Sequence, residues 1–298
     1  MSETPTLGFI GLGVMGSGMC ANVAKKHGGA VHAFDMVPAA LDAACEAGAL
    51  RAASIADVAA RSDIVCLSLP GAKQVAAVCE EIAVHARPGA VVIDLSTTGV
   101  AEARAIAARL AEQGMHFADA PVARTRQAAV EGKLSIMVGA PNALFARIEP
   151  ILSYMGSDVS HCGDVGCGQV VKLINNTLNF VHVLILAEMM VTGERAGVDP
   201  ARLLEAVSKG SGDSFILRNH GMKSMVPRDF PEKSFPPEYV LKDIGYAIEL
   251  AQGMGVKPQV SLLAQKYYEA AVANGLGGRY FPAVIELIEQ GITPGGDD

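Results

Sequence analysis

Short apolar runs recur along the first half of the chain, at intervals that leave room for a helix between most neighbours. In order they are TLGFIGLG, GAVHAFD, DIVCLSLP, AVVIDLS, MHFADAPV and LSIMVGA. Between them lie alanine-rich stretches with helical spacing of apolar positions, such as AEARAIAARLAEQG, whose Gly114 suits the end of a helix. Strands that alternate with helices are typical of parallel strands joined by crossovers. The pattern therefore predicts a doubly wound α/β domain of the Rossmann type over residues 1–163.

The pattern changes near Gly163, beyond which we find only helical periodicity. It is interrupted by Asp-Pro at 199–200, by the segment SKGSGDS and by the proline-rich segment PRDFPEKSFPPE. This part predicts an all-helical second domain over residues 164–298, with a frayed tail, GITPGGDD, at its end. Its first element is expected to be a helix from about Gln169 to Arg195, which would be roughly 40 Å long. A helix of that length can join two domains.

The apolar segment at about 170–191 has the length of a membrane span. Its polar residues are costly in lipid, which favours a helix buried in protein and no membrane association. Because the helix is apolar nearly all round, we expect a second copy of the chain to cover part of it, in a homodimer or homotetramer. The polar residues of the segment are Lys172, Asn175, Asn176, Asn179, His182 and Glu188.

Composition and charge narrow the function class further. The chain has 298 residues, of which 50% are hydrophobic and 18% charged, which is ample material for two cores. The formal net charge of −7 and the lack of any basic block in the sequence argue against nucleic-acid binding. The N-terminal sequence resembles no secretory signal, so we expect a cytoplasmic protein. Six cysteines without a C-x-x-C pair and seven histidines without a clustered motif predict no metal site.

The segment GLGVMG follows the first predicted strand and opens the next predicted helix. In a dinucleotide-binding turn of this form, the first glycine permits the tight turn, the second lets the backbone approach the pyrophosphate, and the third lets helix and strand pack closely. The pyrophosphate then lies at the helix N-terminus, where unpaired N–H groups favour an anion. The alternative is a glycine-rich turn that only connects strand and helix. The candidate cofactor-binding residues of this turn are Gly11, Leu12, Gly13, Val14, Met15 and Gly16.

An acidic residue, Asp35, ends the next predicted strand, nineteen residues after Gly16. A carboxylate at this place can accept hydrogen bonds from the ribose hydroxyls of NAD and repels the extra phosphate of NADP. Met36 and Val37 provide no cation to offset that repulsion. We therefore expect NAD as the cofactor. The alternative is that Asp35 is an ordinary surface acid.

A lysine and two asparagines interrupt the apolar helix near its start. Lys172 and Asn176 are four residues apart and share one helix face, which Asn175 adjoins. Burial lowers the pKa of a lysine towards neutral pH, where it can exchange a proton with a substrate hydroxyl. The amide of Asn176 can hold the substrate without competing for that proton, while Gly166 and Gly168 leave space for substrate and nicotinamide. The alternative is a lysine that reaches solvent near a helix end, with the asparagines as caps.

Four separated segments together resemble the β-hydroxyacid dehydrogenase family, which includes 3-hydroxyisobutyrate dehydrogenases and tartronate semialdehyde reductases. The resemblance spans most of the chain. It implies hydride transfer between nicotinamide and a small hydroxy acid, with Lys172 as the general acid/base and Asn176 as a substrate-positioning amide. The four segments are FIGLGVMG at 9–16, DAPVARTRQAAVEGKLSIMVGA at 119–140, GDVGCGQVVKLINN at 163–176 and LKDIGYAIELA at 241–251.

The resemblance also implies roles for residues that the pattern alone leaves unassigned. Lys242 would reach the nicotinamide end of the cofactor with Asp243 beside it, although without the resemblance the two would be an ordinary pair on a helix surface. Ser96 and Thr97 follow a predicted strand, and open α/β sheets bind ligands at the carboxyl ends of their strands. The implied cofactor-binding residues are Leu69, Pro70, Ser96, Thr97, Lys242 and Asp243, and the implied substrate-binding residues are Ala123, Arg124, Thr125, Asn175 and Ser214.

The segment Ala123-Arg124-Thr125 departs from the family pattern, which commonly has Ser-Gly-Gly there. An arginine offers a planar fork that suits a carboxylate, a sulfonate or a phosphate. The P-V-x-R-T form is similar to that of sulfolactaldehyde reductases, so a sulfonated three-carbon aldehyde is an alternative substrate. In the other interpretation, Arg124 points to solvent or pairs with an acid such as Glu131.

The sequence thus predicts an NAD-dependent oxidoreductase that acts on the CH–OH group of a small anionic hydroxy acid, or that reduces the corresponding semialdehyde. A non-catalytic dinucleotide-sensing protein is the alternative from another class. Lys172 and Asn176 argue against it, because a sensor needs no proton acceptor. Imine-reducing relatives commonly replace this lysine, and a short-chain dehydrogenase would carry Y-x-x-x-K, which the sequence lacks.

Overall fold

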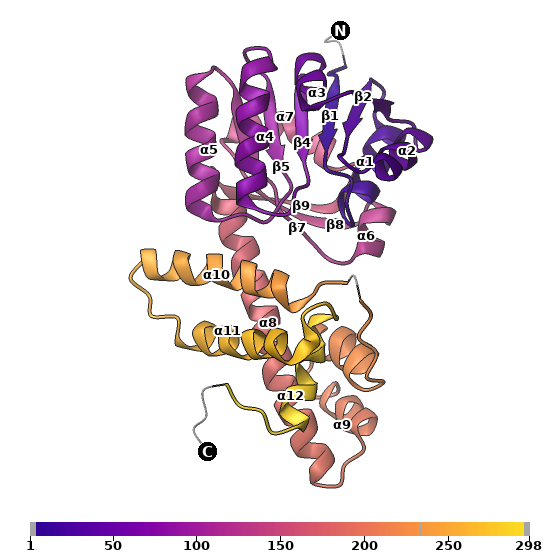
Figure 1. Ribbon diagram of the computed structural model, residues 1–298, viewed down its shortest axis with the longest axis vertical. Helices are drawn as coiled ribbons and strands as arrows, with labels where there is room; N and C mark the ends of the chain where they lie inside the picture. The colour runs from indigo at the N-terminus through magenta and orange to yellow at the C-terminus, as the bar shows by residue number, and fades with distance from the viewer. Residues whose placement is uncertain (1–3, 233, 295–298) are drawn as a thin grey trace. The chain divides into compact units, whose positions relative to one another are not determined.

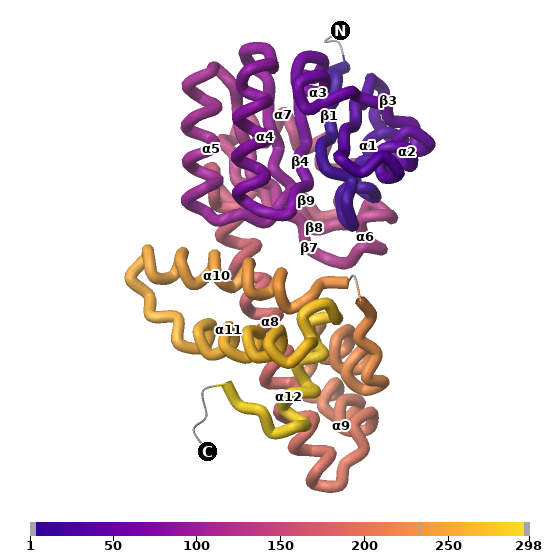
Figure 2. The backbone as a smooth tube through the Cα atoms, in the orientation of Figure 1, coloured from indigo at the N-terminus to yellow at the C-terminus, as the bar shows by residue number. Residues whose placement is uncertain are grey.

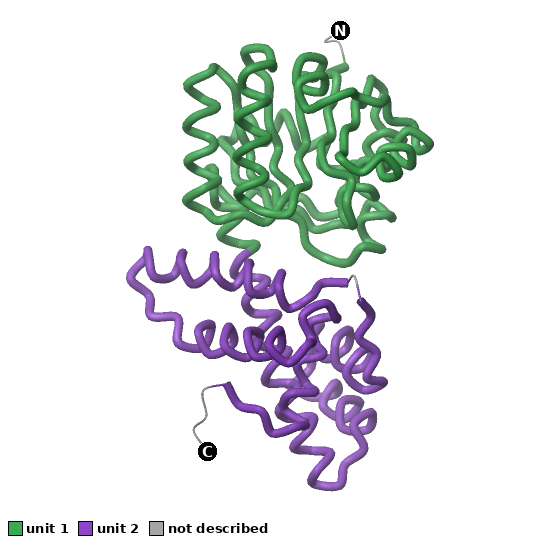
Figure 3. Tube along the Cα trace, viewed as in Figure 1, with its two compact units in different colours: residues 1–172 green, residues 173–298 purple. Residues whose placement is uncertain are grey.

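The computed structural model describes residues 4–232 and 234–294 (Figure 1). The chain divides into two compact units, residues 1–172 and residues 173–298, which Figure 3 shows in different colours. The division falls inside a long helix, whereas the predicted boundary lies before it, between residues 163 and 164. The predicted frayed tail at 291–298 lies partly outside the described residues, because 295–298 are not among them.

A nine-stranded sheet organises unit 1, in the order β3-β2-β1-β4-β5-β6-β8-β7, with β9 paired to β8. The first six strands in this order pair in parallel, as predicted for a doubly wound fold. The short β3 at one end of the order is labelled in Figure 2. The strands are β1 (Leu7–Ile10), β2 (Val31–Phe34), β3 (Leu50–Arg51), β4 (Ile64–Leu67), β5 (Val91–Asp94), β6 (His116–Asp119), β7 (Val122–Ala123), β8 (Leu134–Gly139) and β9 (Gly156–Gly163).

The expectation of parallel strands is wrong for β8, which runs antiparallel to both β6 and β7. A parallel crossover needs a dozen or more residues, usually with a helix that covers the sheet. Here β7 itself pairs with β8, so only the short helix α6 (Arg126–Glu131) and its flanking turns remain for the connection. The chain therefore reverses direction. Three strands were missed: β3 is exposed, β9 has the polar sequence GSDVSHCG, and β7 is a two-residue strand that closely follows β6.

Side chains alternate along the buried strands and build one core on each face of the sheet. In β1, Leu7 and Phe9 face the core that α1, α2 and α7 complete, whereas Ile10 faces the core that α3, α4 and α5 complete. Helices thus cover both faces, as the doubly wound pattern predicts. The helices of unit 1, besides α6, are α1 (Gly16–Lys26), α2 (Pro38–Glu46), α3 (Ile55–Arg61), α4 (Ala72–His85), α5 (Val100–Glu112) and α7 (Asn142–Leu152).

Unit 2 is helical in its described residues, apart from one isolated bridge between Glu232 and Arg279. Helix α8 (Cys167–Arg195) confirms the long helix predicted from about Gln169 to Arg195. Its side chain Phe180 lies in an aromatic cluster with Tyr268 and Phe281, at the centre of the core of unit 2. The other elements are α9 (Pro200–Val207), the π-helix η1 (Leu217–Met225), α10 (Pro237–Gly253), α11 (Gln259–Ala271), η2 (Val272–Leu276), η3 (Phe281–Val284) and α12 (Ile285–Glu289).

By length and composition alone, α8 could cross a membrane, and it is the single helix of the described residues with that property. Within its most apolar window, 44% of the residues are buried in the protein. Two of its polar side chains, Lys172 and Asn176, are also buried, at 8% and 6% exposure. The helix is therefore packed against protein along part of its surface.

Candidate active site

The glycine turn between β1 and α1 has the geometry that a dinucleotide requires. Gly11 has a φ of +94°, and a Cβ atom there would lie 2.2 Å from the carbonyl oxygen of Ser68. A Cβ on Gly16 would lie 2.1 Å from the carbonyl oxygen of Gly11. Gly13, in contrast, is exposed, with no atom within 4 Å of a Cβ placed there. The first and third glycines are thus fixed by close packing, and the second leaves the backbone open to a ligand.

The helix that follows offers its N-terminus to an anion. Met15 precedes α1, and no side chain caps the first turn of the helix. The N–H groups of Ser17 and Met19 donate to the carbonyl oxygens of Gly13 and Met15 in the turn. The positive end of the helix dipole lies here and favours a phosphate. Val14, which adjoins Gly13 in the turn, is 53% exposed. The turn therefore combines open backbone at Gly13 with a helix N-terminus, as pyrophosphate binding requires.

Asp35 lies directly after β2 and is tied to the same turn. Its Oδ2 accepts the backbone N–H of Leu12 at 2.5 Å, and its Oδ1 accepts the N–H of Val37 at 2.8 Å. The next residue, Met36, is 90% exposed and uncharged. The carboxylate is thus held in place beside the glycine turn, with further lone pairs for ribose hydroxyls. This arrangement fits NAD and offers nothing from Met36 or Val37 to a 2′-phosphate.

Leu69, Pro70, Ser96 and Thr97 follow β4 and β5, which are neighbours in the sheet. The hydroxyl of Ser96 accepts the backbone N–H of Leu69 at 2.9 Å and is buried. The two turns therefore hold each other at the carboxyl edge of the sheet, as their assignment to the cofactor requires. The assignment of Ser96 and Thr97 to the cofactor stays a prediction.

Two buried carboxylates lie at neighbouring positions on this edge. Asp94 of β5 and Asp119 of β6 are register partners, and both are completely buried. Asp94 accepts the N–H of Ser96 at 3.0 Å, yet burial raises its pKa to about 7. Burial also raises the pKa of Asp119, against the effect of backbone N–H groups that donate to it. Sequence analysis missed both residues, although a carboxylate that ends an apolar strand is a visible signal.

The start of α8 is anchored by Asp119. Its Oδ1 accepts the N–H of Gly166 at 2.7 Å, and its Oδ2 accepts the N–H of Gln169 at 2.8 Å. A Cβ on Gly168 would lie 2.3 Å from the carbonyl oxygen of Met137. Gly166 has a φ of +92°. The two glycines were expected to leave space for substrate and nicotinamide; in the structure they serve the entry of the chain into α8 and its close packing on β8.

Lys172 and Asn176 lie one turn apart on α8, as predicted, and both are buried. The amide of Asn176 has a fixed orientation: its Nδ2 donates to Oδ2 of Asp243 at 2.7 Å, and its Oδ1 accepts from Nδ2 of Asn175 at 3.1 Å. Lys172 is 8% exposed, which does not fit the alternative of a lysine that extends into solvent. The asparagines cap no helix end here, since α8 starts at Cys167.

Asp243 is not half of a surface pair. It is 2% exposed on α10, where its Oδ1 lies 3.1 Å from Nζ of Lys242. The ammonium of Lys242 also lies 5.8 Å from the ring centre of Tyr246. Asp243 was assigned to the cofactor because it adjoins Lys242. Its carboxylate also accepts from the amide of Asn176, and its assignment to the cofactor stays a prediction.

Arg124 is held on the protein surface by unit 1 itself. Its guanidinium donates to the carbonyl oxygen of Lys133 at 2.6 Å and to Oγ of Ser157 at 2.9 Å, and it pairs with Asp158 at 2.7 Å. The pairing interpretation therefore describes this structure, although the acid is Asp158. Glu131, the acid that we expected, binds Lys133 and Gln127.

The backbone explains why the family commonly has glycine at this place. Arg124 has a φ of +86°, a conformation that costs a residue with a Cβ free energy. Ala123 belongs to β7 and pairs with Ser135 of β8, while the hydroxyl of Thr125 accepts the N–H of Ala128 and caps α6. These side chains thus shape the turn.

Ser214 has partners within unit 2. Its hydroxyl accepts the N–H of Leu217 at 3.0 Å, at the start of η1, and lies 3.4 Å from Nε2 of His182. The residue is half-buried. Its assignment to substrate binding stays a prediction.

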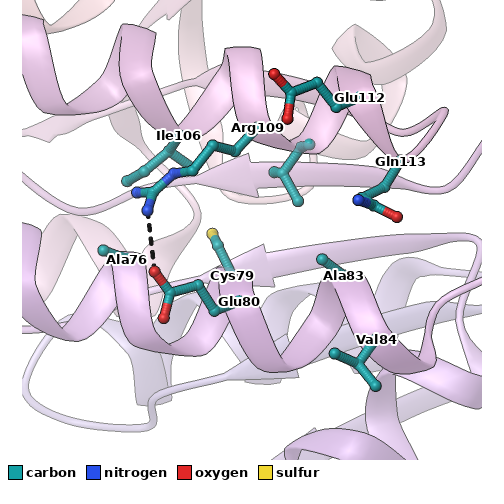
Figure 4. Close-up of a pocket in the computed structure, with 10 residues that line it drawn as sticks. Ala76, Cys79, Glu80, Ala83, Val84, Ile106, Arg109, Glu112 and Gln113 are labelled. Carbon is teal, nitrogen blue, oxygen red and sulfur yellow. Dashed lines mark hydrogen bonds and ion pairs between the residues drawn. The ribbon is translucent and has the colours of Figure 1, made fainter.

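A groove of about 450 Å³ lies between the C-terminal halves of α4 and α5, away from these residues (Figure 4). It is lined by apolar atoms of Cys79, Ala83 and Ile106, and Arg109 pairs with Glu80 across it at 2.9 Å. Both helices run back from the carboxyl ends of their strands, so their C-terminal halves lie towards the opposite edge of the sheet. Burial raises the pKa of the Cys79 thiol, which makes it unreactive. The groove contains none of the predicted site residues.

Comparison with known families supports the same assignment over most of the chain. Residues 6–163 match the family model for the NAD binding domain of 6-phosphogluconate dehydrogenase. Residues 166–288 match the model for the NAD-binding domain of NADP-dependent 3-hydroxyisobutyrate dehydrogenase. NAD as the cofactor is thereby confirmed.

Individual relatives agree. The chain is 36% identical to 2-(hydroxymethyl)glutarate dehydrogenase of Eubacterium barkeri, with 97% of each chain covered. It is 32% identical to the NAD-dependent L-serine dehydrogenase of Pseudomonas aeruginosa, over 95% of this chain and 97% of the relative. The solved structure of Mycobacterium tuberculosis 3-hydroxyisobutyrate dehydrogenase with L-serine is similar, with a TM-score of 0.88, 29% identity and coverage of 96% and 99%. The chain therefore belongs to the β-hydroxyacid dehydrogenase family, whose members are NAD(P)-dependent oxidoreductases that act on CH–OH groups.

Proposed function

We propose that the protein oxidises a short carboxylic acid with a hydroxyl group on its third carbon, or reduces the corresponding semialdehyde, with Lys172 as the general acid/base. The observation that carries this proposal is the burial of Lys172 one turn before the oriented amide of Asn176 on α8. A proton donor and an amide in this spacing can address one substrate oxygen together.

The cofactor has matching residues in unit 1. The open backbone at Gly13 and the N-terminus of α1 would bind the pyrophosphate, and Asp35 would bind the adenosine ribose. Leu69 and Pro70 would contact the adenosine side, while Ser96 and Thr97 would contact nicotinamide. When bound, NAD supplies the hydride acceptor at C4 of its nicotinamide ring.

Lys172 performs the proton transfer. In oxidation its neutral amine accepts the proton of the substrate hydroxyl at Nζ, and in reduction its ammonium returns a proton to the new alkoxide oxygen. Asn176 donates from its amide to the substrate without exchanging a proton. General acid/base catalysis of this type contributes about 10²- to 10⁴-fold to a rate.

The relatives guide the choice of substrate. Their names refer to 2-(hydroxymethyl)glutarate, L-serine and 3-hydroxyisobutyrate. All three are carboxylates with a primary hydroxyl on the carbon next to C2. In this protein, the backbone N–H groups of the turn at 123–125 would bind that carboxylate. A sulfonate has less support, because the guanidinium of Arg124 already binds Asp158.

A substrate panel tests the proposal. C3 to C6 hydroxy acids and semialdehydes, including sulfolactaldehyde, would be assayed by the change in NADH absorbance. We expect the highest kcat/KM for an acid with a primary hydroxyl on its third carbon. Preference for sulfolactaldehyde would replace the carboxylate assignment. Absence of turnover on the whole panel, with NADH still bound, would support the non-catalytic alternative.

We also infer that the protein forms a homodimer or homotetramer. Five exposed apolar side chains follow one another along α8 at helical spacing, and their exposed fractions run from 39% to 67%. A second copy of the chain is the occupant that α8 suits, because the same stripe on both copies is self-complementary. The five are Val171, Ile174, Leu178, Ile185 and Met189.

Light scattering after gel filtration tests this inference. Each chain has a mass of 30.9 kDa, so a dimer and a tetramer are readily distinguished. Leu178→Glu places a charge on the stripe and is expected to lower the mass. Val84→Glu is the matched control, since Val84 is 76% exposed on α4. A wild-type chain that elutes as a monomer contradicts the inference.

A further inference from the structure

The side chain of Gln169 connects α8 to the turn after β5. It is completely buried and has a partner for each of its polar atoms. Its Oε1 accepts the backbone N–H of Thr98 at 3.1 Å, and its Nε2 donates to the carbonyl oxygen of Ser96 at 2.8 Å. An amide that bridges a backbone donor and a backbone acceptor in this way fixes the turn at 96–98 relative to the first turn of the helix.

The backbone of Gln169 is fixed as well. Its N–H donates to Oδ2 of Asp119 at 2.8 Å. Two glycines make room for that carboxylate: a Cβ on Gly139 would lie 2.4 Å from its Oδ1, and one on Gly168 would lie 2.9 Å from its Oδ2. The backbone of Gln169 is therefore anchored by Asp119 of β6, next to Gly139 of β8, and its side chain anchors the turn after β5.

Lys172 follows Gln169 by three residues, so the two are nearly one turn apart on the same rigid helix. We propose that Gln169, supported by Asp119, is a positioning residue that sets the distance between Nζ of Lys172 and the nicotinamide-binding turn at Ser96–Thr97. This inference rests on the proposed function, which gives Lys172 the proton transfer and the turn its cofactor contact. A displacement of about 1 Å between reacting groups can cost 10²-fold in rate.

The main variant is Gln169→Met, which keeps the length of the side chain and removes both hydrogen bonds. We expect kcat on the best substrate of the panel to fall about ten- to hundredfold. NADH binding, measured by fluorescence titration, should change less than about threefold, because most cofactor contacts lie at the glycine turn and Asp35. A substrate deuterated at the carbinol carbon should show a larger isotope effect on kcat than in the wild type, because hydride transfer becomes slower.

A second variant, Gln169→Glu, gives a signature that a purely structural role would not produce. The neutral acid can donate to Ser96 and accept from Thr98 like the amide, whereas the carboxylate cannot donate. Asp119, which binds the N–H of the same residue, disfavours the carboxylate. The ratio of kcat for Gln169→Glu to kcat for Gln169→Met should therefore rise severalfold as the pH falls from about 8 to 6. Effects common to both variants, such as protonation of Lys172, cancel in this ratio.

Gln127→Met is the matched control, because Gln127 is exposed on α6 and its amide donates to Glu131 on the same helix. Wild-type kcat and isotope effect in Gln169→Met would overturn the inference. So would a ratio that does not change with pH. If Gln169→Met fails to fold, kcat of Gln169→Glu is divided by kcat of the wild type at each pH instead, and the same rise is expected. Failure of the proposed function has a different result: the wild type turns over no hydroxy acid, or Lys172→Ala is as active as the wild type.

Discussion

Two consecutive turns of α8 carry the predicted proton donor and the predicted substrate amide, and they are anchored in different ways. Around Lys172, the anchors are backbone groups: Asp119 accepts two main-chain N–H groups, and Gln169 binds the main chain of the turn at 96–98. Around Asn176, the anchors are the side chains of Asn175 and Asp243. The carboxylates of Asp119 and Asp243 are both buried, at 0% and 2% exposure.

This difference in anchoring means that the turn with Lys172 is fixed by the fold, whereas the contacts of Asn176 can adjust. A main-chain N–H that loses a buried acceptor cannot turn towards another one, so the anchors of the first turn are part of the fold. Side chains can change rotamer or take up water, so the anchors of the second turn can follow a substrate. Substitutions near Lys172 should therefore lower both stability and activity, whereas substitutions near Asn176 should act mainly on activity.

The largest expected effect comes from the two residues themselves. Lys172→Ala removes the proton donor and should lower kcat about 10²- to 10⁴-fold with little change in NADH binding. Asn176→Ala leaves proton transfer in place and should act mainly on KM for the hydroxy acid, by about ten- to hundredfold. Steady-state kinetics give kcat and KM for both variants, which are compared with those of the wild type. Equal losses of kcat in the two would show that they act as one unit, which would break the proposed division.

Replacing each buried carboxylate by its amide tests the anchors directly. In Asp119→Asn, one oxygen that accepts a main-chain N–H becomes a donor that opposes it, which should cost roughly 3 kcal/mol of unfolding free energy. In Asp243→Asn, the remaining oxygen can still accept from Asn176, and Lys242, whose side chain is 27% exposed, can move away. That variant should lose less than about 1 kcal/mol, while kcat/KM falls about tenfold because the amide loses a charged acceptor.

Urea unfolding of the two variants, with the wild type as reference, gives both free energies. The isosteric change is the same in each, so the difference reports the anchor and not the loss of volume. A smaller loss for Asp119→Asn than for Asp243→Asn would contradict the distinction between main-chain and side-chain anchors.

Asp94 adds a pH dependence to the scaffold. Burial raises its pKa to about 7, above the value of about 3.9 of an aspartate in an unfolded chain. Between these values the folded protein holds a proton that the unfolded chain has released, so this group contributes stability that is lost as the pH rises towards 7. From pH 5 to pH 8 the wild type should lose on the order of 2 to 3 kcal/mol relative to Asp94→Asn. Parallel stability curves for the two proteins would refute this pKa.

Cofactor choice should depend on unit 1 alone, through Asp35. We expect the wild type to bind NADH at least about tenfold more tightly than NADPH, because the carboxylate repels the 2′-phosphate. Asp35→Asn keeps an acceptor for the N–H of Leu12 and should reduce the difference in affinity between NADH and NADPH. Asp42→Asn is the control, since Asp42 is exposed on α2 and pairs with Arg51. Fluorescence titration with both nucleotides decides; tighter binding of NADPH to the wild type would reject the role of Asp35.

The sequence pattern predicted what depends on local signals. The six apolar runs, the glycine turn with Asp35, and the helix that carries Lys172 and Asn176 all follow from periodicity and spacing. The antiparallel direction of β8 could not be predicted from the sequence pattern, because strand direction depends on pairing between segments. The burial of Asp243 could not be predicted either, because in the sequence it resembles any charged residue on a helix.

The missed site residues share one property. Asp94, Asp119 and Gln169 are buried polar residues that bind main-chain groups, and the partners of Asp119 and Gln169 are distant in sequence. No spacing rule connects Gln169 with Ser96, because the sheet brings them together. The visible signal was composition: a polar residue that ends an apolar strand or interrupts an apolar helix is costly unless it is paired.

Arg124 should have the smallest effect, because its contributions nearly cancel. Its φ of +86° costs on the order of 1 kcal/mol, and its partly exposed ion pair with Asp158 returns about as much or less. Arg124→Ala removes the pair and keeps the unfavourable backbone, so it should lose about 1 kcal/mol. Arg124→Gly removes both and should unfold at nearly the same urea concentration as the wild type, since glycine adopts this φ readily.

Kinetics of the same variants sharpen the comparison, because the guanidinium of Arg124, like the amide of Asn176, binds a carboxylate side chain, here that of Asp158 on the protein surface. KM for carboxylate substrates should stay within about threefold of the wild type in Arg124→Ala, and Asp158→Asn should match it, since both break the same ion pair. A KM that rises tenfold or more in Arg124→Ala but not in Asp158→Asn would mean that the guanidinium leaves Asp158 to bind the substrate anion. Under that outcome a rise confined to sulfonated substrates would restore the sulfonate hypothesis, because the guanidinium of Arg124 adds a cation that the Ser-Gly-Gly form of the family lacks at this turn.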